Sequence, residues 1–217
     1  MSFKIVVFDF DGTIADTSEG ILDAHRYALS SMGRDLPSDD ELRKLIGGNL
    51  FKTYSETFGF GEEGARKAVD LYRKRYAEVG IFKAVLYPGF ANMLKQFKSN
   101  GIKIGVATLK AERFANLMLE RFGVSCLFDY VCGMDEGDKE TKSSLITKCL
   151  SLSGFSKEEC LFVGDSFNDY YGSKESCVPF LGVTYGFGFN KKTKHDFCTV
   201  DTARDIFAFV KNHLSDN

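Results

Sequence analysis

Two aspartates follow the first apolar segment of the chain. Asp9 and Asp11 come directly after Ile5–Phe8, and Gly12 behind them lets the backbone turn sharply. The side chain of one aspartate and the main chain of the other can therefore converge on one hard cation, which prefers oxygen ligands. The alternative is an ordinary acidic turn, because Asp-Gly is a common turn dipeptide.

Three further places carry residues that could act with this pair. Thr108 follows a second apolar segment, Lys142 precedes an apolar helical pattern, and Asp165 and Asp169 follow a fourth apolar segment. Taken singly, they could be a helix cap, a solvated lysine and a polar turn. Because parallel strands bring their carboxyl ends to one edge of a sheet, their order along the chain favours a single site.

The elements that must position these residues alternate along the chain. Short β-rich apolar segments are separated by stretches with helical spacing, for example 111–122, 143–152 and 202–214. This alternation predicts an α/β protein with a parallel sheet covered by helices on both faces. The expected strands are Ile5–Phe8, Ile102–Ala107, Tyr130–Cys132, Leu161–Val163 and Pro179–Val183.

The connection between the first two strands is far longer than a crossover helix requires. Apolar residues within it recur at helical spacing, and a helix is expected from Asp39 to near Gly47, capped by Ser38. We therefore predict a helical cap domain at 17–83, inserted into a catalytic core formed by 1–16 and 84–217. His25 falls on the apolar stripe of the first cap helix and is expected to be a packed histidine.

Composition narrows the classes of partner. The chain has 44% hydrophobic and 27% charged residues, with a net charge of −2, and therefore lacks the broad basic field of a nucleic-acid-binding protein. No segment approaches the roughly 18 uninterrupted apolar residues of a membrane span. The six cysteines show no C-x-x-C spacing and are expected to be reduced thiols, partly buried. We expect a cytoplasmic protein that binds neither nucleic acid nor membrane.

Taken together, these features make the sequence resemble the haloacid dehalogenase superfamily of phosphotransferases, from Lys4 to about His213. Its motifs match as Asp-Phe-Asp-Gly-Thr at 9–13, Thr108, Lys142 and Gly-Asp-Ser at 164–166 with Asp169. The resemblance implies a Rossmann-like parallel sheet core that carries an inserted α-helical cap domain.

The resemblance also implies a role for each motif residue. Asp9 is the expected nucleophile, Asp11 the general acid and base, Thr108 a hydrogen-bond donor to the phosphoryl group, and Lys142 the cation that holds nucleophile and phosphate together. Lys139 is a rival for the last role, but helical sequence follows Lys142 directly.

A magnesium site follows from the same resemblance. The Asp9 carboxylate, the Asp11 carbonyl and Asp165 are the expected ligands of Mg²⁺, and Asp169 is expected to position ligands or water from behind them. Such a cation and an ammonium together offset the charge of a phosphomonoester, which otherwise repels an incoming carboxylate.

Local differences separate the members of the superfamily. Dehalogenases lack the second aspartate, so Asp11 favours phosphoryl transfer. Mutases acting on β-glucose 1-phosphate carry a histidine where this chain has Ile21, and an arginine-bearing cap stretch where it has Gly-Gly-Asn-Leu at 47–50. The cap sequence is more similar to the phosphoglycolate-phosphatase-like subfamily, although Leu109 replaces its usual Asn or Ser.

The expected activity is magnesium-dependent hydrolysis of small phosphorylated metabolites, phosphoglycolate-like acids or sugar phosphates, through an aspartyl-phosphate. Two alternatives stay open: a phosphomutase of the β-phosphoglucomutase type, and a non-catalytic phosphate-sensing or protein-binding module. The intact set of Asp9, Asp11, Lys142 and Asp165 argues against the last, because a binding module needs no nucleophile beside an acid.

Overall fold

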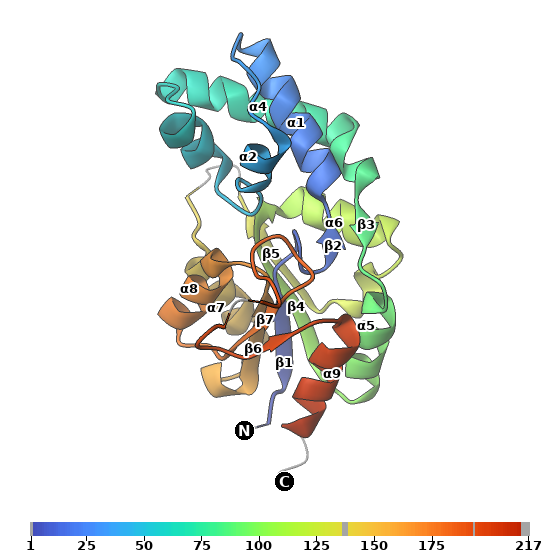
Figure 1. Cartoon of the computed structure of the whole chain (residues 1–217). Coiled ribbons are helices and arrows are strands. Elements are labelled where there is room, and N and C mark those ends of the chain that lie inside the picture. Colours follow the sequence, from blue (N-terminus) through green and yellow to red (C-terminus); the bar gives the residue numbers. More distant parts are fainter. Residues whose placement is uncertain (1, 136–138, 193, 214–217) are drawn as a thin grey trace.

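The computed structural model describes residues 2–135, 139–192 and 194–213. A parallel sheet of six strands in the order β5-β4-β1-β6-β7-β8 forms the centre of this described part (Figure 1). The strands are β1 (Ile5–Phe8), β4 (Lys103–Ala111), β5 (Tyr130–Met134), β6 (Cys160–Gly164), β7 (Phe180–Val183) and β8 (Thr199–Val200). The prediction of a parallel α/β sheet is confirmed.

Helices cover both faces of the sheet. One face carries α5 (Phe90–Ser99), α6 (Glu112–Arg121) and α9 (Ala203–Asn212), and the other carries α7 (Lys142–Ser153) and α8 (Phe167–Ser176) (Figure 1). Short 3₁₀ turns, η3 (Ser125–Leu127) and η4 (Lys157–Glu159), lead into β5 and β6.

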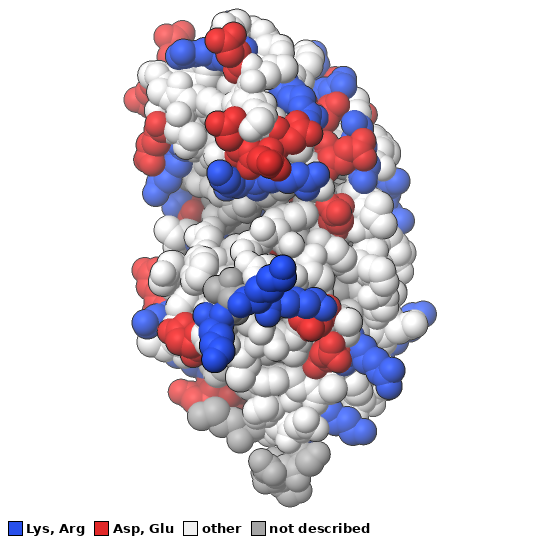
Figure 2. All heavy atoms as spheres, viewed as in Figure 1, with Lys and Arg blue, Asp and Glu red and all other residues white. Residues whose placement is uncertain are grey.

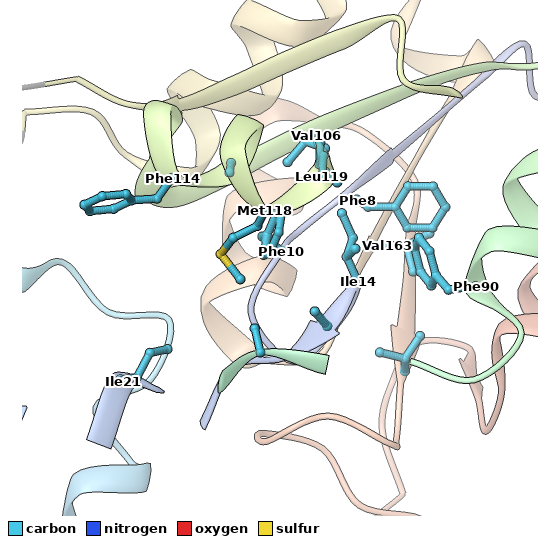
Figure 3. Close-up of a cluster of buried hydrophobic side chains, with 14 of the residues drawn as sticks. Phe8, Phe10, Ile14, Ile21, Phe90, Val106, Phe114, Met118, Leu119 and Val163 are labelled. Atoms are coloured by element: carbon cyan, nitrogen blue, oxygen red, sulfur yellow. The ribbon is translucent and has the colours of Figure 1, made fainter. Parts of the chain in front are cut away.

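Successive side chains of β1 pack into two separate parts of the hydrophobic core, one on each face of the sheet. Val6 and Phe8 belong to the cluster under α5 and α6, whereas Ile5 and Val7 belong to the cluster under α7, as expected when successive strand residues point to opposite faces. The first cluster, including Phe90 from α5, is shown in Figure 3. Burial on both faces explains why β1 is apolar at every position.

The long first connection folds into helices that lie beyond the carboxyl end of the sheet (Figure 1). The antiparallel helices α1 and α4 pack closely together, and β2 pairs with β3 where the chain leaves and rejoins the sheet. The elements are β2 (Ala15–Asp16), α1 (Ser18–Ser31), α2 (Asp39–Arg43), α3 (Leu50–Lys52), the π-helix η1 (Thr53–Thr57), α4 (Glu62–Glu78), η2 (Gly80–Lys83) and β3 (Val85–Leu86).

The structure corrects two predicted boundaries. The helix from Asp39 is capped by Ser38 as expected, but it ends at Arg43, and turns rather than helix lead to Gly47, where φ is +80°. The second strand does not end at Ala107: it continues past Thr108 to Ala111, which pairs with β5 after a shift in register.

Charged side chains of both signs are interspersed over the face shown in Figure 2. No helix in the described parts of the chain is long and apolar enough to cross a membrane. All six cysteines are described and free, with Cys132, Cys149 and Cys160 buried.

Candidate active site

Asp9 and Lys142 meet at the carboxyl end of the sheet. Asp9 follows the last residue of β1, and its N–H is fixed by the carbonyl of Val163 at 2.9 Å. Lys142 opens α7, and its Nζ lies 2.6 Å from Oδ1 of Asp9 and 2.9 Å from Oδ1 of Asp169. One ammonium therefore holds two buried carboxylates in place.

Burial controls the electrostatics of this pair. Burial and the nearby charge of Asp169 raise the pKa of Asp9 to about 6, although Lys142 opposes this rise. Burial alone disfavours the ammonium of Lys142, but the attraction of Asp169 and Asp9 outweighs it and raises the lysine pKa. At neutral pH the two groups form an ion pair that lies out of reach of bulk water.

Asp165 follows β6 and is enclosed by backbone. Its Oδ2 accepts hydrogen bonds from the N–H groups of Phe187 (2.6 Å) and Gly188 (3.3 Å), and its Oδ1 accepts one from Oγ1 of Thr13 (3.3 Å). A Cβ atom on Gly12, whose φ is +83°, would lie 2.4 Å from Oδ2 of Asp165. Only glycine fits beside this carboxylate.

Asp169 lies one turn into α8, and both of its oxygens have partners. Oδ1 faces Lys142, while Oδ2 accepts from the N–H (3.0 Å) and Oγ (2.7 Å) of Ser166. Its carboxylate is therefore engaged by the protein itself, which suits a residue that positions its neighbours.

The site fits a hard divalent cation. One oxygen each of Asp9, Asp165 and Asp169 lies within 4.8 Å of the others, and carboxylate oxygens are the donors that Mg²⁺ prefers. Burial and the neighbouring carboxylates also raise the pKa of Asp165, and a bound cation would relieve this repulsion. Asp9 and Asp165 remain the predicted side-chain ligands, with the carboxylate of Asp169 close beside them.

Asp11 lies beside this cluster and faces the cap. Its Oδ1 accepts a hydrogen bond from Oγ1 of Thr17 at 2.6 Å and lies 2.9 Å from Nζ of Lys110. Lys110 also donates to the hydroxyl of Tyr76 in α4, at 2.9 Å. Asp11 is therefore tied both to Thr17, which precedes α1, and to Lys110 of β4, which contacts α4.

A cavity of about 50 Å³ separates the motif residues from the cap helices. Its core wall includes Asp9, Asp11 and Thr108, and its cap wall includes Ile21 and Tyr72. Gly47 also lines the cavity, and its carbonyl accepts a hydrogen bond from Asn168 of α8 at 3.2 Å. The cavity is thus lined by charged groups on one side and mostly by apolar and aromatic groups on the other.

The structure brings together the predicted site residues. Asp9, Asp11 and Thr108 line one cavity, and Lys142, Asp165 and Asp169 cluster around Asp9. Lys139 is exposed and lies in a neighbouring groove instead of at the carboxylates. His25 is buried in the cap, 3.0 Å from the hydroxyl of Tyr54, with its ring 4.7 Å from that of Tyr72.

Sequence reasoning missed several contributors. Lys110 and Thr17 both contact Asp11, and the N–H groups of Phe187 and Gly188 hold Asp165. The sequence gives only a weak signal for Lys110, which is its position two residues after Thr108. The loop at 185–188 gives no such signal, because backbone groups perform its function.

The chain is similar in sequence to known proteins. Residues 6–183 match the family described as haloacid dehalogenase-like hydrolase. A 5'-nucleotidase of Pseudomonas aeruginosa is 33% identical over 189 residues, covering 87% of this chain and 86% of that protein. Phosphoglycolate phosphatase 1 of the same species is 29% identical, covering 94% of this chain and 78% of that protein.

Solved structures agree in fold. A structure described as a predicted phosphatase from Clostridium acetobutylicum superimposes with a TM-score of 0.91 at 28% identity, covering 98% of this chain and all of that one. The chain belongs to the haloacid dehalogenase-like hydrolases. Within that family it is a phosphatase, a hydrolase of phosphoric monoesters.

Proposed function

We propose that this phosphatase hydrolyses small phosphorylated metabolites in a magnesium-dependent reaction that passes through an aspartyl-phosphate on Asp9. The observation that carries the proposal is the position of Lys142, which contacts both Asp9 and Asp169 at the sheet edge where Asp11 and Asp165 also lie. A buried carboxylate with a cation on one side and an acid on the other suits nucleophilic attack on phosphorus.

The reaction proceeds in two displacements. In the first, the Asp9 carboxylate bonds to phosphorus while the bond from phosphorus to the ester oxygen breaks, and Asp11 gives that oxygen its proton. In the second, Asp11 takes a proton from water, whose oxygen bonds to phosphorus as the bond to Asp9 breaks. Inorganic phosphate leaves and both carboxylates return to their starting forms.

Several groups hold the phosphoryl group during these steps. Thr108, buried on the cavity wall beside Asp9, donates its hydroxyl to a phosphoryl oxygen, and Lys142 offsets the charge between nucleophile and phosphate. Mg²⁺ held by the Asp9 carboxylate, the Asp11 carbonyl and Asp165 would supply further charge neutralisation. Asp169 positions Lys142 and the turn at Ser166.

We assign residues 17–83 to a mobile cap and 1–16 with 84–217 to the core. The pairing of Asp16 with Val85 joins the two connecting segments and makes this short sheet the expected hinge. Closure over a bound ester would exclude water from the first displacement.

The cavity favours a small leaving group. Its volume, about 50 Å³, has room for a few water molecules, whereas sites for drug-sized ligands occupy roughly 300–1,000 Å³. The name of one relative indicates a nucleotide as its substrate, and the name of another indicates phosphoglycolate. With the cap placed as it is here, the smaller of the two is the better fit.

The cap wall disfavours mutase activity. Ile21, Gly47 and Gly48 line the cavity where the mutases carry their histidine and cap arginine. An enzyme that returns the phosphoryl group to a sugar needs polar groups to hold and reorient the intermediate, and the polar side chains of this wall, His25 and Arg73 among them, come from other positions than those of the mutase residues. Hydrolysis needs only water, which the site admits when the cap opens.

The deciding experiment is a panel of phosphoesters with Mg²⁺, in which free phosphate and isomerised product are both measured. We expect release of phosphate from small esters and a phosphorylated protein that can be trapped by rapid acid quench. Isomer formation without free phosphate would support the mutase, and no turnover of any ester would support the binding module. A cytoplasmic location and the absence of nucleic-acid partners remain predictions.

A further inference from the structure

His25 is a buried histidine on the wall of the catalytic cavity. It lies in α1, is 1% exposed, and lines the same cavity as Asp9 and Asp11. Burial lowers the pKa of His25 to about 4, so its ring is neutral near pH 7. A neutral imidazole has one nitrogen that donates a hydrogen bond and one that accepts. The position of the ring proton therefore decides what His25 can bind.

Tyr54 determines where that proton lies. Its hydroxyl is fully buried and lies 3.0 Å from Nδ1 of His25. Burial raises the pKa of Tyr54 above its usual value, so the hydroxyl keeps its proton. In the part of the chain that the structure describes, Nδ1 is the one hydrogen-bond partner of this hydroxyl, and a buried hydroxyl needs such a partner. Tyr54 therefore donates to Nδ1, and the ring proton of His25 lies on Nε2.

The Nε2–H group of His25 is left for a ligand. Because Nδ1 is turned towards Tyr54, Nε2 is the polar atom that the ring can present to the cavity. Among the described residues, none forms a hydrogen bond with Nε2. The ring of Tyr72 packs against His25 with 4.7 Å between the ring centres, which limits rotation of the imidazole. A buried donor without a partner is unfavourable, so an acceptor in the cavity is expected.

The cavity also contains two cations, which act differently. Nζ of Lys110 lies 2.9 Å from both Asp11 and the hydroxyl of Tyr76, and Arg73 lines both the cavity and a larger groove beside it. Both attract an anionic substrate as a whole, because Coulomb attraction falls off slowly with distance. A neutral N–H group in a fixed direction instead discriminates by the position of one acceptor atom. That is the contribution available to His25.

We propose that His25 is a specificity-determining residue whose Nε2–H donates to an oxygen of the leaving group, and that Tyr54 positions it by fixing its proton. This inference rests on the proposed function, in which Asp11 protonates the ester oxygen. Since the cavity measures about 50 Å³, a leaving group that meets Asp11 also reaches the wall at His25. An ester with a hydroxyl oxygen two carbon atoms beyond the ester oxygen is favoured over one with a methyl group there, which leaves Nε2–H unpaired.

The test compares 2-hydroxyethyl phosphate with propyl phosphate, in which a methyl group replaces the hydroxyl. Phosphate release with Mg²⁺ gives kcat/KM for each ester, and the ratio of the two values is compared between proteins, so that the intrinsic reactivities of the esters cancel. His25→Leu should lower this ratio by about tenfold, the effect of one lost hydrogen bond. His25→Gln, whose amide can donate, should retain part of it. An unchanged ratio in His25→Leu would overturn the inference, even if the variant were slower with both esters.

His213→Leu is the matched control. His213 also packs against two aromatic rings, but it lies at the end of α9 and outside the residues that line the cavity, so its variant should keep the wild-type ratio. If the wild type hydrolyses other esters of the panel but not 2-hydroxyethyl phosphate, the inference is wrong and the proposed function stands. If it releases phosphate from no ester at all, the proposed function itself fails.

The position of the ring proton can be measured without any substrate. Nitrogen-15 NMR of the histidine rings distinguishes a protonated from an unprotonated ring nitrogen, and in the wild type we expect the proton of His25 on Nε2. Tyr54→Phe removes the hydroxyl that fixes it, so the proton should distribute over both nitrogens and the ratio of kcat/KM values should fall. A proton held on Nδ1 in the wild type would overturn the inference.

Discussion

Nζ of Lys142 lies 2.6 Å from Oδ1 of Asp9, and both side chains are almost fully buried. Replacing Lys142 with Met removes the cation that offsets phosphate charge during attack. We expect kcat to fall by about 10²–10³-fold, as for loss of one preorganised donor. We also expect the free energy of unfolding to fall by about 3–5 kcal/mol, because the change breaks a buried ion pair. Steady-state kinetics and urea unfolding measure the two effects.

Lys139→Met provides the control for this substitution. Lys139 is exposed and close in sequence, and it is the other candidate for the same role. Its variant should keep nearly wild-type kcat and stability. A large loss of kcat in Lys139→Met together with a small loss in Lys142→Met would reverse the assignment.

Asp9→Asn tests the nucleophile. A neutral amide attacks phosphorus poorly and is a weaker ligand for a hard cation, so turnover should fall by at least about a thousandfold. Circular dichroism and the thermal midpoint should stay close to wild type, because Asn is nearly isosteric, burial already disfavours the charge of Asp9, and Lys142 keeps Asp169 as its ion-pair partner. Asp40→Asn, at an exposed position of α2, should change neither. Activity within about tenfold of wild type would remove Asp9 from the mechanism.

Removal of divalent cations should stop turnover. Three buried carboxylates converge at the site with one ammonium beside them, so a second cation is needed before a phosphate dianion can approach. After treatment with a chelator, activity should return with Mg²⁺ but only weakly with Ca²⁺, whose larger and more flexible coordination shell would misplace Asp9. Equal rates with the two ions, or full activity in the chelator, would contradict the expected role.

The parts of the fold predicted from the sequence are those that strong local patterns specify. Burial on both faces makes β1 and β6 apolar throughout, and the residues after them, Asp9 and Asp165, are recognisable by type and position. The missed elements have weaker signals. The strands β2, β3 and β8 are each two residues long, and tertiary contacts specify them.

Lys110 shows why part of the site could not be predicted. A lysine near the end of a strand is usually solvated, and only the position of Tyr76 on α4, distant in sequence, makes this one buried. The same holds for the loop at 185–188. Its glycines are needed because Cβ atoms at Gly186 and Gly188 would lie 2.4 and 2.6 Å from atoms of Asp165, a constraint that follows from the folded structure alone.

His25 should make the stability of the protein depend on pH. Burial lowers its pKa from 6.5 to about 4, so between these values the unfolded chain binds a proton that the folded chain does not. The free energy of unfolding should therefore fall as the pH falls through this range, by about 2 kcal/mol between pH 7 and pH 5 from this group. The raised pKa of Asp9 acts in the opposite direction, so the measurement must isolate His25.

Comparison with His25→Gln isolates the contribution. Glutamine keeps a polar group near the hydroxyl of Tyr54, which lies 3.0 Å from Nδ1 of His25, but it does not titrate. Urea unfolding at pH 7 and pH 5 should show a larger loss of stability in the wild type than in the variant. An equal loss in both proteins would show that His25 is not protonated preferentially in the unfolded state.

Gly12→Ala tests the link between backbone geometry and the cation site. Gly12 has a φ of +83°, and a Cβ there would lie 2.4 Å from Oδ2 and 2.7 Å from Cγ of Asp165. The new methyl group must displace that carboxylate, which also accepts from the N–H of Phe187. We expect the Mg²⁺ concentration for half-maximal activity to rise by about tenfold or more, the lower end for disturbing the support of a metal ligand. The left-handed backbone conformation should also lower the free energy of unfolding by about 1–2 kcal/mol, the usual penalty for a Cβ atom in that conformation.

Gly33→Ala separates the two effects. Gly33 has a φ of +67°, so alanine is strained there as well, but its Cβ would meet nothing within 4 Å. This variant should lose a similar amount of stability from backbone strain and keep the wild-type dependence on Mg²⁺. The comparison uses activity titrated with Mg²⁺ together with urea unfolding of both variants. If Gly12→Ala were destabilised yet needed no more Mg²⁺ than Gly33→Ala, the carboxylate of Asp165 could shift without consequence, and its assignment as a metal ligand would be wrong.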